Sequence, residues 1–175
     1  MKQLDFSAVI TEVNRANGSG VIVRVPADVD KELPARSTVM LLGTVNGKRA
    51  RVPLEPDGEM GHWFTLDKKT MHLLGTRVGS ALRISAATTK DWPEPMVPPV
   101  LAAALQASPA AKQTWEQTTV VARWEWVRWF NMVKTEQAKN ERPAKIISML
   151  SHGKKRPCCF NRSMQELPKN IEFLL

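Results

Sequence analysis

The sequence predicts an α+β fold in which a small β-barrel-like domain is followed by a helical domain. Residues 4–86 read as short β-like runs separated by turn residues, whereas residues 100–151 carry helical patterns. Four prolines within residues 91–99 separate the two patterns, which is typical of a stiff, extended connector. We therefore expect a β-barrel-like domain at 1–90, the connector at 91–99, a helical domain at 100–162 and an irregular tail at 163–175.

The first two strands of the barrel-like domain are expected over residues 6–13 and 21–25. Residues 14–20 between them are rich in asparagine and glycine, which tolerate positive φ, so they predict a loop. Pro26 suits the first turn of a helix and Asp28 favours a helix start, so a short helical turn is expected to follow and to reach residue 33.

A β-hairpin is the clearest local signal in the chain. Residues 38–45 and 48–54 are strand-like and are joined by Asn46 and Gly47. Because a type I′ turn needs two residues with positive φ, this dipeptide predicts a tight two-residue turn.

Further strands are expected at residues 62–66 and 80–86, with a short helix at 68–74 that ends at Gly75. Strands at this spacing, without long crossover helices, are typical of a small antiparallel or mixed barrel or sandwich.

The rear half predicts four helices. They are expected at residues 100–106, 108–118 and 120–139, and at 144–151 after Pro143, with Gly153 as the end of the last. Within the third, the spacing of an apolar stripe predicts a buried face made of Trp126, Trp129, Phe130 and Val133. Trp124 points away from this face, so we expect it to contact the barrel-like domain or a protein partner.

The charge balance indicates the kind of partner to expect. The chain carries a net charge of +8, which favours a polyanion, an anionic surface or a phosphate-bearing ligand over a cationic partner. No stretch reaches the roughly 18 apolar residues of a membrane span, and the first six residues carry charges without an apolar core. We therefore expect a cytoplasmic protein without a transmembrane segment.

The hairpin carries one candidate binding site. Arg49 and Arg51 lie on alternate residues of its second strand, so their side chains share one face. Together with Lys48, and with Trp63 on a neighbouring strand, they would line a groove for an anionic small molecule. The alternative is a solvent-facing row of cations that keeps a strand edge from aggregating.

A second basic cluster lies in residues 139–162, where seven cations accompany a single carboxylate, Glu141. Such a cluster neutralises phosphates, so nucleic-acid binding is the first alternative function, with Phe160 and Trp124 available for stacking on bases. A solvated surface is the other interpretation, because no recognised nucleic-acid motif accompanies the charge. The cations are Lys139, Arg142, Lys145, Lys154, Lys155, Arg156 and Arg162.

The two cysteines, Cys158 and Cys159, are adjacent, so they cannot form the long-range crosslink of a small secreted domain. Neighbouring cations favour a thiolate, which makes a thiol-based redox switch the second alternative function. Otherwise one cysteine packs as a small hydrophobe. His152 with the two cysteines lacks a fourth zinc ligand, so no metal and no other cofactor is expected.

Catalysis has little support in the sequence. His62 and His72 stand apart from any Ser, Cys or carboxylate pattern of a catalytic triad, so both are expected at the surface or at a strand edge. No catalytic residue is predicted. An enzyme stays an alternative only if the fold brings a histidine and a carboxylate together in a closed pocket.

Several short motifs resemble a known bacterial family. Residues 25–29, residues 42–47, the turn at 56–58 and the segment 75–79 resemble a small β-barrel domain of unknown function. The rear half, through motifs at 100–105, 126–129, 148–153 and 156–161, resembles the YdeI/OmpD-associated, or bacteriocin-protection, family. The resemblance implies a role in stress or antibacterial-peptide tolerance and supplies no catalytic residues. We therefore expect a noncatalytic binding protein.

Overall fold

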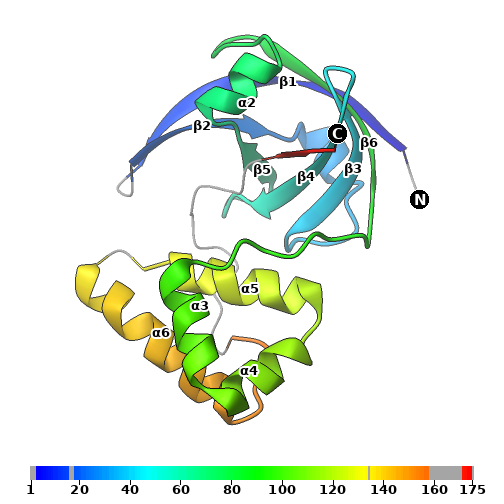
Figure 1. Ribbon diagram of the computed structural model, residues 1–175. Helices are drawn as coiled ribbons and strands as arrows, with labels where there is room; N and C mark the ends of the chain where they lie inside the picture. The colour runs from blue at the N-terminus through cyan, green and yellow to red at the C-terminus, as the bar shows by residue number, and fades with distance from the viewer. Residues whose placement is uncertain (1–2, 16–17, 134, 158–170, 175) are drawn as a thin grey trace. The chain divides into compact units, whose positions relative to one another are not determined.

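The chain divides into two compact units (Figure 1). One consists of Met1–Asp91 with Arg162–Leu175, and the other of Trp92–Asn161. The computed structural model describes residues 3–15, 18–133, 135–157 and 171–174.

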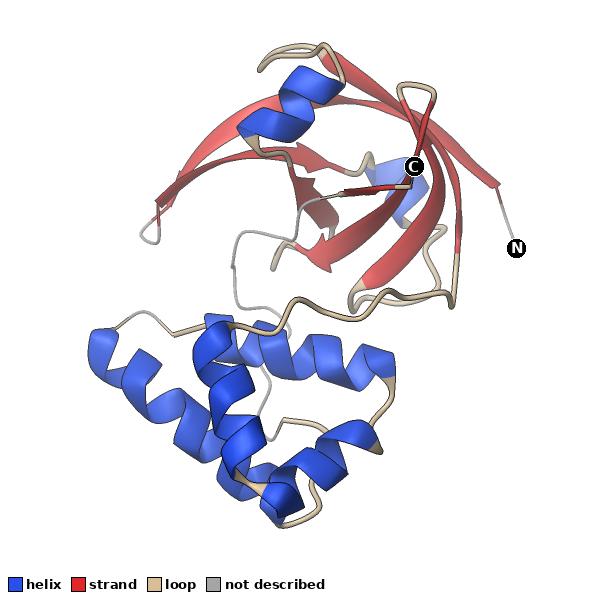
Figure 2. Cartoon of the chain, in the orientation of Figure 1, coloured by secondary structure: helices blue, strands red, loops and turns tan. Residues whose placement is uncertain are grey.

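Six antiparallel strands close into a barrel in the first unit (Figure 2). Each of the six pairs with a neighbour on both sides, because the last strand of the ring pairs again with the first. In ring order they are β3 (Val39–Val45), β6 (Ala81–Thr88), β1 (Gln3–Arg15), β2 (Gly18–Arg24), β5 (His62–Thr65) and β4 (Lys48–Pro56). Closure gives every strand of the ring a partner on each side over at least part of its length.

The pairing that closes the ring is the predicted hairpin. Strands β3 and β4 pair from Val45↔Lys48 along to Val39↔Leu54, and the turn residues Asn46 and Gly47 have φ values of 47° and 79°. These angles belong to the left-handed region that a type I′ turn requires, so the hairpin prediction is confirmed.

The barrel interior is filled by alternate residues of the strands, because successive side chains point to opposite faces. Strand β1 illustrates the pattern, since Leu4, Phe6, Ala8 and Ile10 are buried between exposed neighbours. The same alternation runs along β6, where Leu82, Ile84 and Ala86 join the core. The first unit therefore has one apolar core, enclosed by the ring.

Two short helices cover opposite ends of this core. Helix α1 (Ala27–Asp30) follows β2, and helix α2 (Lys68–Leu73) follows β5, which runs antiparallel to β2. Val29 of α1 and Met71 of α2 pack against the core from the two ends. Helix α2 begins where the Asp67 side chain accepts a hydrogen bond from the Thr70 amide, which caps its first turn.

A seventh strand, β7 (Glu172–Phe173), pairs with the first half of β4 (Figure 1). It pairs Phe173 with Ala50 and Glu172 with Arg51, while Ile171 is buried in the barrel core. The segment expected to be irregular at 163–175 therefore contains a strand. Two paired residues are too few for the alternation that identifies strands in a sequence.

The second unit consists of four helices, shown in blue in Figure 2. Helix α6 packs against the other three, and its Ile146 and Leu150 meet Leu101 and Trp126 in a separate apolar core. The helices are α3 (Pro99–Ala107), α4 (Pro109–Glu116), α5 (Val120–Asn131) and α6 (Glu136–Ser151). The predicted α+β class, a barrel followed by helices, is confirmed.

Three predicted boundaries are wrong. The helix expected over 120–139 is two helices, because Thr135 caps a new helix by accepting a hydrogen bond from the Ala138 amide at 3.2 Å. Pro143 lies inside α6 instead of starting a helix, and its ring is buried there. The loop expected at 14–20 is mostly strand, since Asn14 pairs with Ser19 in the ladder between β1 and β2.

The tryptophans of α5 lie partly as expected. Trp126 is fully buried, whereas Trp129 is half-buried and stacks edge-on against Trp126 at 6.0 Å. Trp124 contacts the connector of its own unit, where its Nε1 donates to the Pro93 carbonyl at 2.7 Å and its ring meets Trp92. Arg123 adds two bonds to the Glu94 carboxylate, at 2.6 and 2.9 Å. Residues 92–94 are therefore held against α5.

None of the helices in the described ranges is long and apolar enough to cross a membrane.

A glycine in β3 gives a test of the closed ring. A Cβ on Gly43 would lie 2.2 Å from the Ser85 carbonyl oxygen, so Gly43→Ala forces the backbones of β3 and β6 apart and should cost about 3 kcal/mol of the free energy of unfolding. Gly47→Ala is the matched control, because nothing lies within 4 Å of its Cβ and only the positive φ opposes it, at about 1 kcal/mol. Urea denaturation measures both; equal costs would contradict the close approach of β3 and β6.

Candidate functional site

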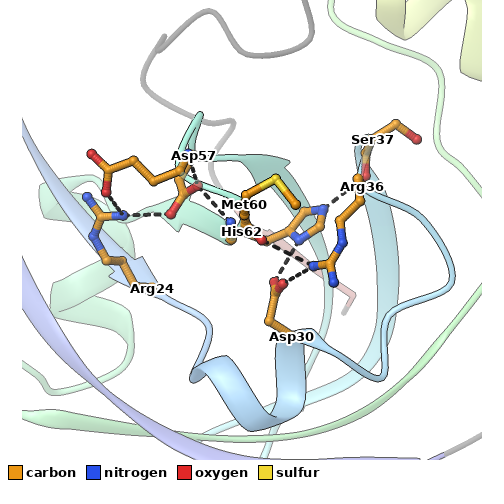
Figure 3. Close-up of polar contacts among 9 residues, drawn as sticks. Arg24, Asp30, Arg36, Ser37, Asp57, Met60 and His62 are labelled. Carbon is orange, nitrogen blue, oxygen red and sulfur yellow. Dashed lines mark hydrogen bonds and ion pairs between the residues drawn. The ribbon is translucent and has the colours of Figure 1, made fainter.

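A buried histidine and a carboxylate meet at the α1 end of the barrel (Figure 3). His62 begins β5 and has the same strand parity as the core residue Phe64, so its ring points inward. Its Nδ1 lies 2.7 Å from Asp30 Oδ1, and its Nε2 lies 3.0 Å from the Ser37 carbonyl oxygen. The side chains of His62 and Asp30 are 1% and 5% exposed. This is a closely packed polar pair inside the protein.

Both ring nitrogens of His62 face oxygen acceptors. Arg36 also contacts the pair, because its guanidinium donates to Asp30 Oδ2 at 2.5 Å and to the Met60 carbonyl at 3.1 Å. Neither nitrogen of the His62 ring is left to exchange a proton with a substrate.

A tight loop lies beside this pair and is organised by Asp57 (Figure 3). One carboxylate oxygen accepts from the amides of Glu59 and Gly61 at 2.7 and 2.9 Å, and the other accepts from Arg24 at 2.7 Å. Met60 takes a φ of 72° in this loop, and 78% of its surface is exposed. The bonds to Asp57 hold the loop around this residue in its unusual conformation.

The expectation that His62 lies at a surface or strand edge is wrong, whereas His72 on α2 is exposed as expected. The partner carboxylate was missed because Asp30 lies 32 positions away from His62. The signal in the sequence is the alternation of β5, which places His62 on the same face as Phe64.

The structure does not bring the four residues of the predicted anion groove together. Lys48 and Arg49 are exposed beside the hairpin turn, whereas Trp63 is fully buried and pairs with Glu55 at the other end of β4. Six residues of strand separate Arg49 from Glu55, which is about 20 Å. Trp63 instead lies under the Arg24 guanidinium, at 5.1 Å from its ring centre.

Arg51 is already paired within the first unit. Its guanidinium donates to Asp91 at 2.5 Å and to Glu172 at 3.3 Å. The hydrogen bond to Asp91 is the main reason that the pKa of Arg51 is raised above its ordinary value, with Glu172 adding to it. Arg51 therefore stays charged and joins β4 to the end of the connector and to β7.

The predicted basic cluster of the second unit is partly neutralised. Lys139 pairs with Glu136 at 2.6 Å, Lys145 with Glu141 at 3.1 Å, and Arg156 with Glu125 at 3.5 Å. Hydrogen bonds from Gln137 and Lys145 lower the pKa of the Glu141 carboxyl. The spacing of the first two pairs, three and four residues along a helix, is visible in the sequence.

The remaining cations of that cluster differ in their surroundings. The Arg142 guanidinium lies 4.0 Å from the Trp129 ring centre. Lys154 and Lys155 are exposed, and neither forms an ion pair with a carboxylate in the described part of the chain. Arg162, Cys158, Cys159 and Phe160 lie outside the described residues.

Within the described residues, no group of three or more His, Cys, Asp or Glu side chains is placed to hold a metal ion. His152 instead hydrogen-bonds the Ser148 carbonyl through Nδ1 at 2.7 Å, within its own helix end.

Comparison with family models agrees with the two units. Residues 6–85 match a domain of unknown function, DUF1905, and residues 94–153 match the family described as Bacteriocin-protection, YdeI or OmpD-Associated. The helical unit is therefore similar to this bacteriocin-protection family, and the barrel is similar to DUF1905. The resemblance predicted from short motifs is confirmed, with the DUF1905 match on the barrel and the bacteriocin-protection match on the helices. A search of curated proteins found no match.

The two histidines of the barrel unit give a matched test of the buried pair. His62→Leu removes the ring that lies between the buried Asp30 carboxylate and the Ser37 carbonyl, so it should lower the free energy of unfolding by about 3–5 kcal/mol. His72→Leu, on an exposed helix surface, should change it by less than about 0.5 kcal/mol. Chemical denaturation followed by tryptophan fluorescence measures both. Similar values for the two variants would show that the buried pair contributes little.

Proposed function

We propose that this protein is a noncatalytic binding protein that recognises an anionic partner through its barrel. The observation that carries the proposal is an exposed cationic surface at the hairpin end of the barrel. It consists of Lys48, Arg49 and Arg83, which we call the hairpin face. Among the described residues, none of these three cations forms an ion pair.

The strand register brings the hairpin face together. Arg49 on β4 pairs with Thr44 on β3, and Thr44 pairs with Ser85 on β6. Arg49 and Ser85 are therefore separated by two strand spacings, about 10 Å across the sheet. Arg83 has the same outward parity as Ser85, and its backbone is bonded to Asn46 in the hairpin turn. Arg49 and Arg83 share the outward face beside the turn, and Lys48 lies next to the turn with the opposite strand parity. Exposed cations that form no ion pair among the described residues attract an anion.

The buried pair supports a noncatalytic role. Every ring nitrogen and carboxylate oxygen of His62 and Asp30 is engaged within the protein, so this pair acts in folding. General acid or base catalysis needs such a group to reach a substrate proton.

The family description supports a role in tolerance of antibacterial peptides. A net charge of +8 disfavours direct capture of a positively charged peptide, because like charges repel on approach. An anionic cellular partner fits the hairpin face better. Nucleic-acid binding by the second unit has less support, since Lys139, Lys145 and Arg156 are paired with carboxylates.

Binding of a fluorescein-labelled hexaglutamate peptide, measured by anisotropy at low and moderate salt, tests the proposal. Removing two charges with Arg49→Gln and Arg83→Gln should weaken binding about tenfold, and the wild-type affinity should fall as salt rises. The matched control is Lys68→Gln with Lys69→Gln, which removes the same charge from an exposed surface of α2. Equal weakening by both double variants would show an effect of net charge alone and would defeat the proposal.

A further inference from the structure

Strand β7 occupies an edge of β4 that the barrel ring leaves free. Strand β5 pairs with β4 only at Glu55 and Pro56, so the first half of β4 has β3 on one side and β7 on the other. The ring of six strands is complete without β7, because β4 already pairs with both β3 and β5. Loss of β7 would therefore expose an edge and leave the barrel closed.

Three kinds of contact hold β7 on this edge. The Leu174 amide donates to the Arg49 carbonyl at 2.9 Å, and hydrogen-bonded pairs alternate along an antiparallel ladder, so the Glu172 amide also faces β4. Ile171 is 6% exposed in the barrel core, and Phe173 packs against that core. Glu172 points outward and pairs with Arg51 at 3.3 Å.

We propose that the Arg49–Arg51 edge of β4 is a strand-addition site for an extended peptide with an apolar–acidic–aromatic pattern, and that β7 is its resident occupant. Backbone bonds supply affinity in this mode of recognition, and pockets for alternate side chains supply selectivity. The seated segment shows the chemistry that fits, since Ile171 and Phe173 enter the core while Glu172 meets a cation. This rests on the proposed function and names its partner as an acidic peptide.

The pairing of β7 is short enough for exchange. Two of its residues pair with β4, as in the β4–β5 pairing, whereas the longest ring pairings cover seven residues on each strand. Unlike β5, β7 has no second strand on its other side. A resident strand in the same chain competes through a high effective concentration, so an outside peptide binds weakly until the resident strand is weakened.

The test measures binding of a fluorescein-labelled peptide with the sequence of residues 170–175, Asn-Ile-Glu-Phe-Leu-Leu, to the full chain. Phe173→Ala in the protein, and more strongly Ile171→Asp with Phe173→Asp, weaken the resident strand. Both variants should bind the peptide at least about tenfold more tightly than the wild-type protein. Equal affinity for wild type and variants would overturn the proposal, and the milder Phe173→Ala variant decides if the double variant does not fold.

Two controls make the test specific for strand addition. A peptide with proline in place of Glu172 lacks the amide that faces β4 and should not bind; binding as tight as the parent peptide would refute the pairing. Arg51→Glu in the Phe173→Ala background should weaken the parent peptide and favour one with arginine in place of Glu172. If the Arg51→Glu variant binds the parent peptide as tightly as before and does not prefer the arginine peptide, Arg51 is not part of the binding site.

The outcomes also separate this inference from the anion-binding proposal. Hexaglutamate binding that depends on Arg49 and Arg83, without any gain from weakening β7, would overturn strand addition and keep the hairpin face. Light scattering, which measures the oligomeric state, tests whether the β7 strand of a second copy occupies this edge of β4. A wild-type dimer that becomes monomeric on Phe173→Ala would place the strand of another copy on this edge and overturn exchange with a separate peptide.

Discussion

The antiparallel pairing of β3 with β4 is the constraint on which the barrel depends. It joins the two ends of the strand order β3-β6-β1-β2-β5-β4, so that the sheet becomes a ring. The turn that makes this pairing is short, because Asn46 and Gly47 both adopt positive φ. Gly43 lets β3 approach β6 on the other side, where a side chain would meet the Ser85 backbone. Ring closure then encloses one apolar core and fixes which side chains face outward.

Closure of the ring also explains why short helices cover the two ends of the barrel. A ring of strands covers the sides of its core and leaves two openings, which α1 and α2 cover. At the α1 end the covering chain brings polar groups inside, and the His62–Asp30 pair satisfies them together with Arg36 and the Ser37 carbonyl. A histidine that is saturated with hydrogen bonds in this way has a role in structure. The proposed binding sites are the exposed cations at the hairpin end and the edge of β4 that β7 occupies.

Features that arise from neighbouring residues were predictable, and features that arise from distant ones were not. The hairpin and the short helix ended by Gly75 are encoded by local conformational preference, so the sequence analysis placed them correctly. The break between α5 and α6 was missed because the apolar spacing continues past it and Thr135 is an ordinary residue until its capping bond is seen. The Asp30–His62 pair and strand β7 depend on contacts across 32 and about 120 positions, which no local pattern reports. The pairing of Lys145 with Glu141 was visible as helical spacing, and it reduces the free charge of the basic cluster.

The account separates a stable ring of six strands from an added seventh strand, and amide hydrogen exchange measures that difference directly. Amides in the ring ladder, such as those of Thr44 and Ser85, which alternation from the Asn46–Arg83 bond places in a hydrogen-bonded pair, should exchange only through global unfolding. The Leu174 amide, which bonds the Arg49 carbonyl, should exchange at least about 100-fold faster, because β7 opens while the ring stays closed. Protection of Leu174 equal to that of the ring amides would contradict the account, since β7 would then be part of the same cooperative unit.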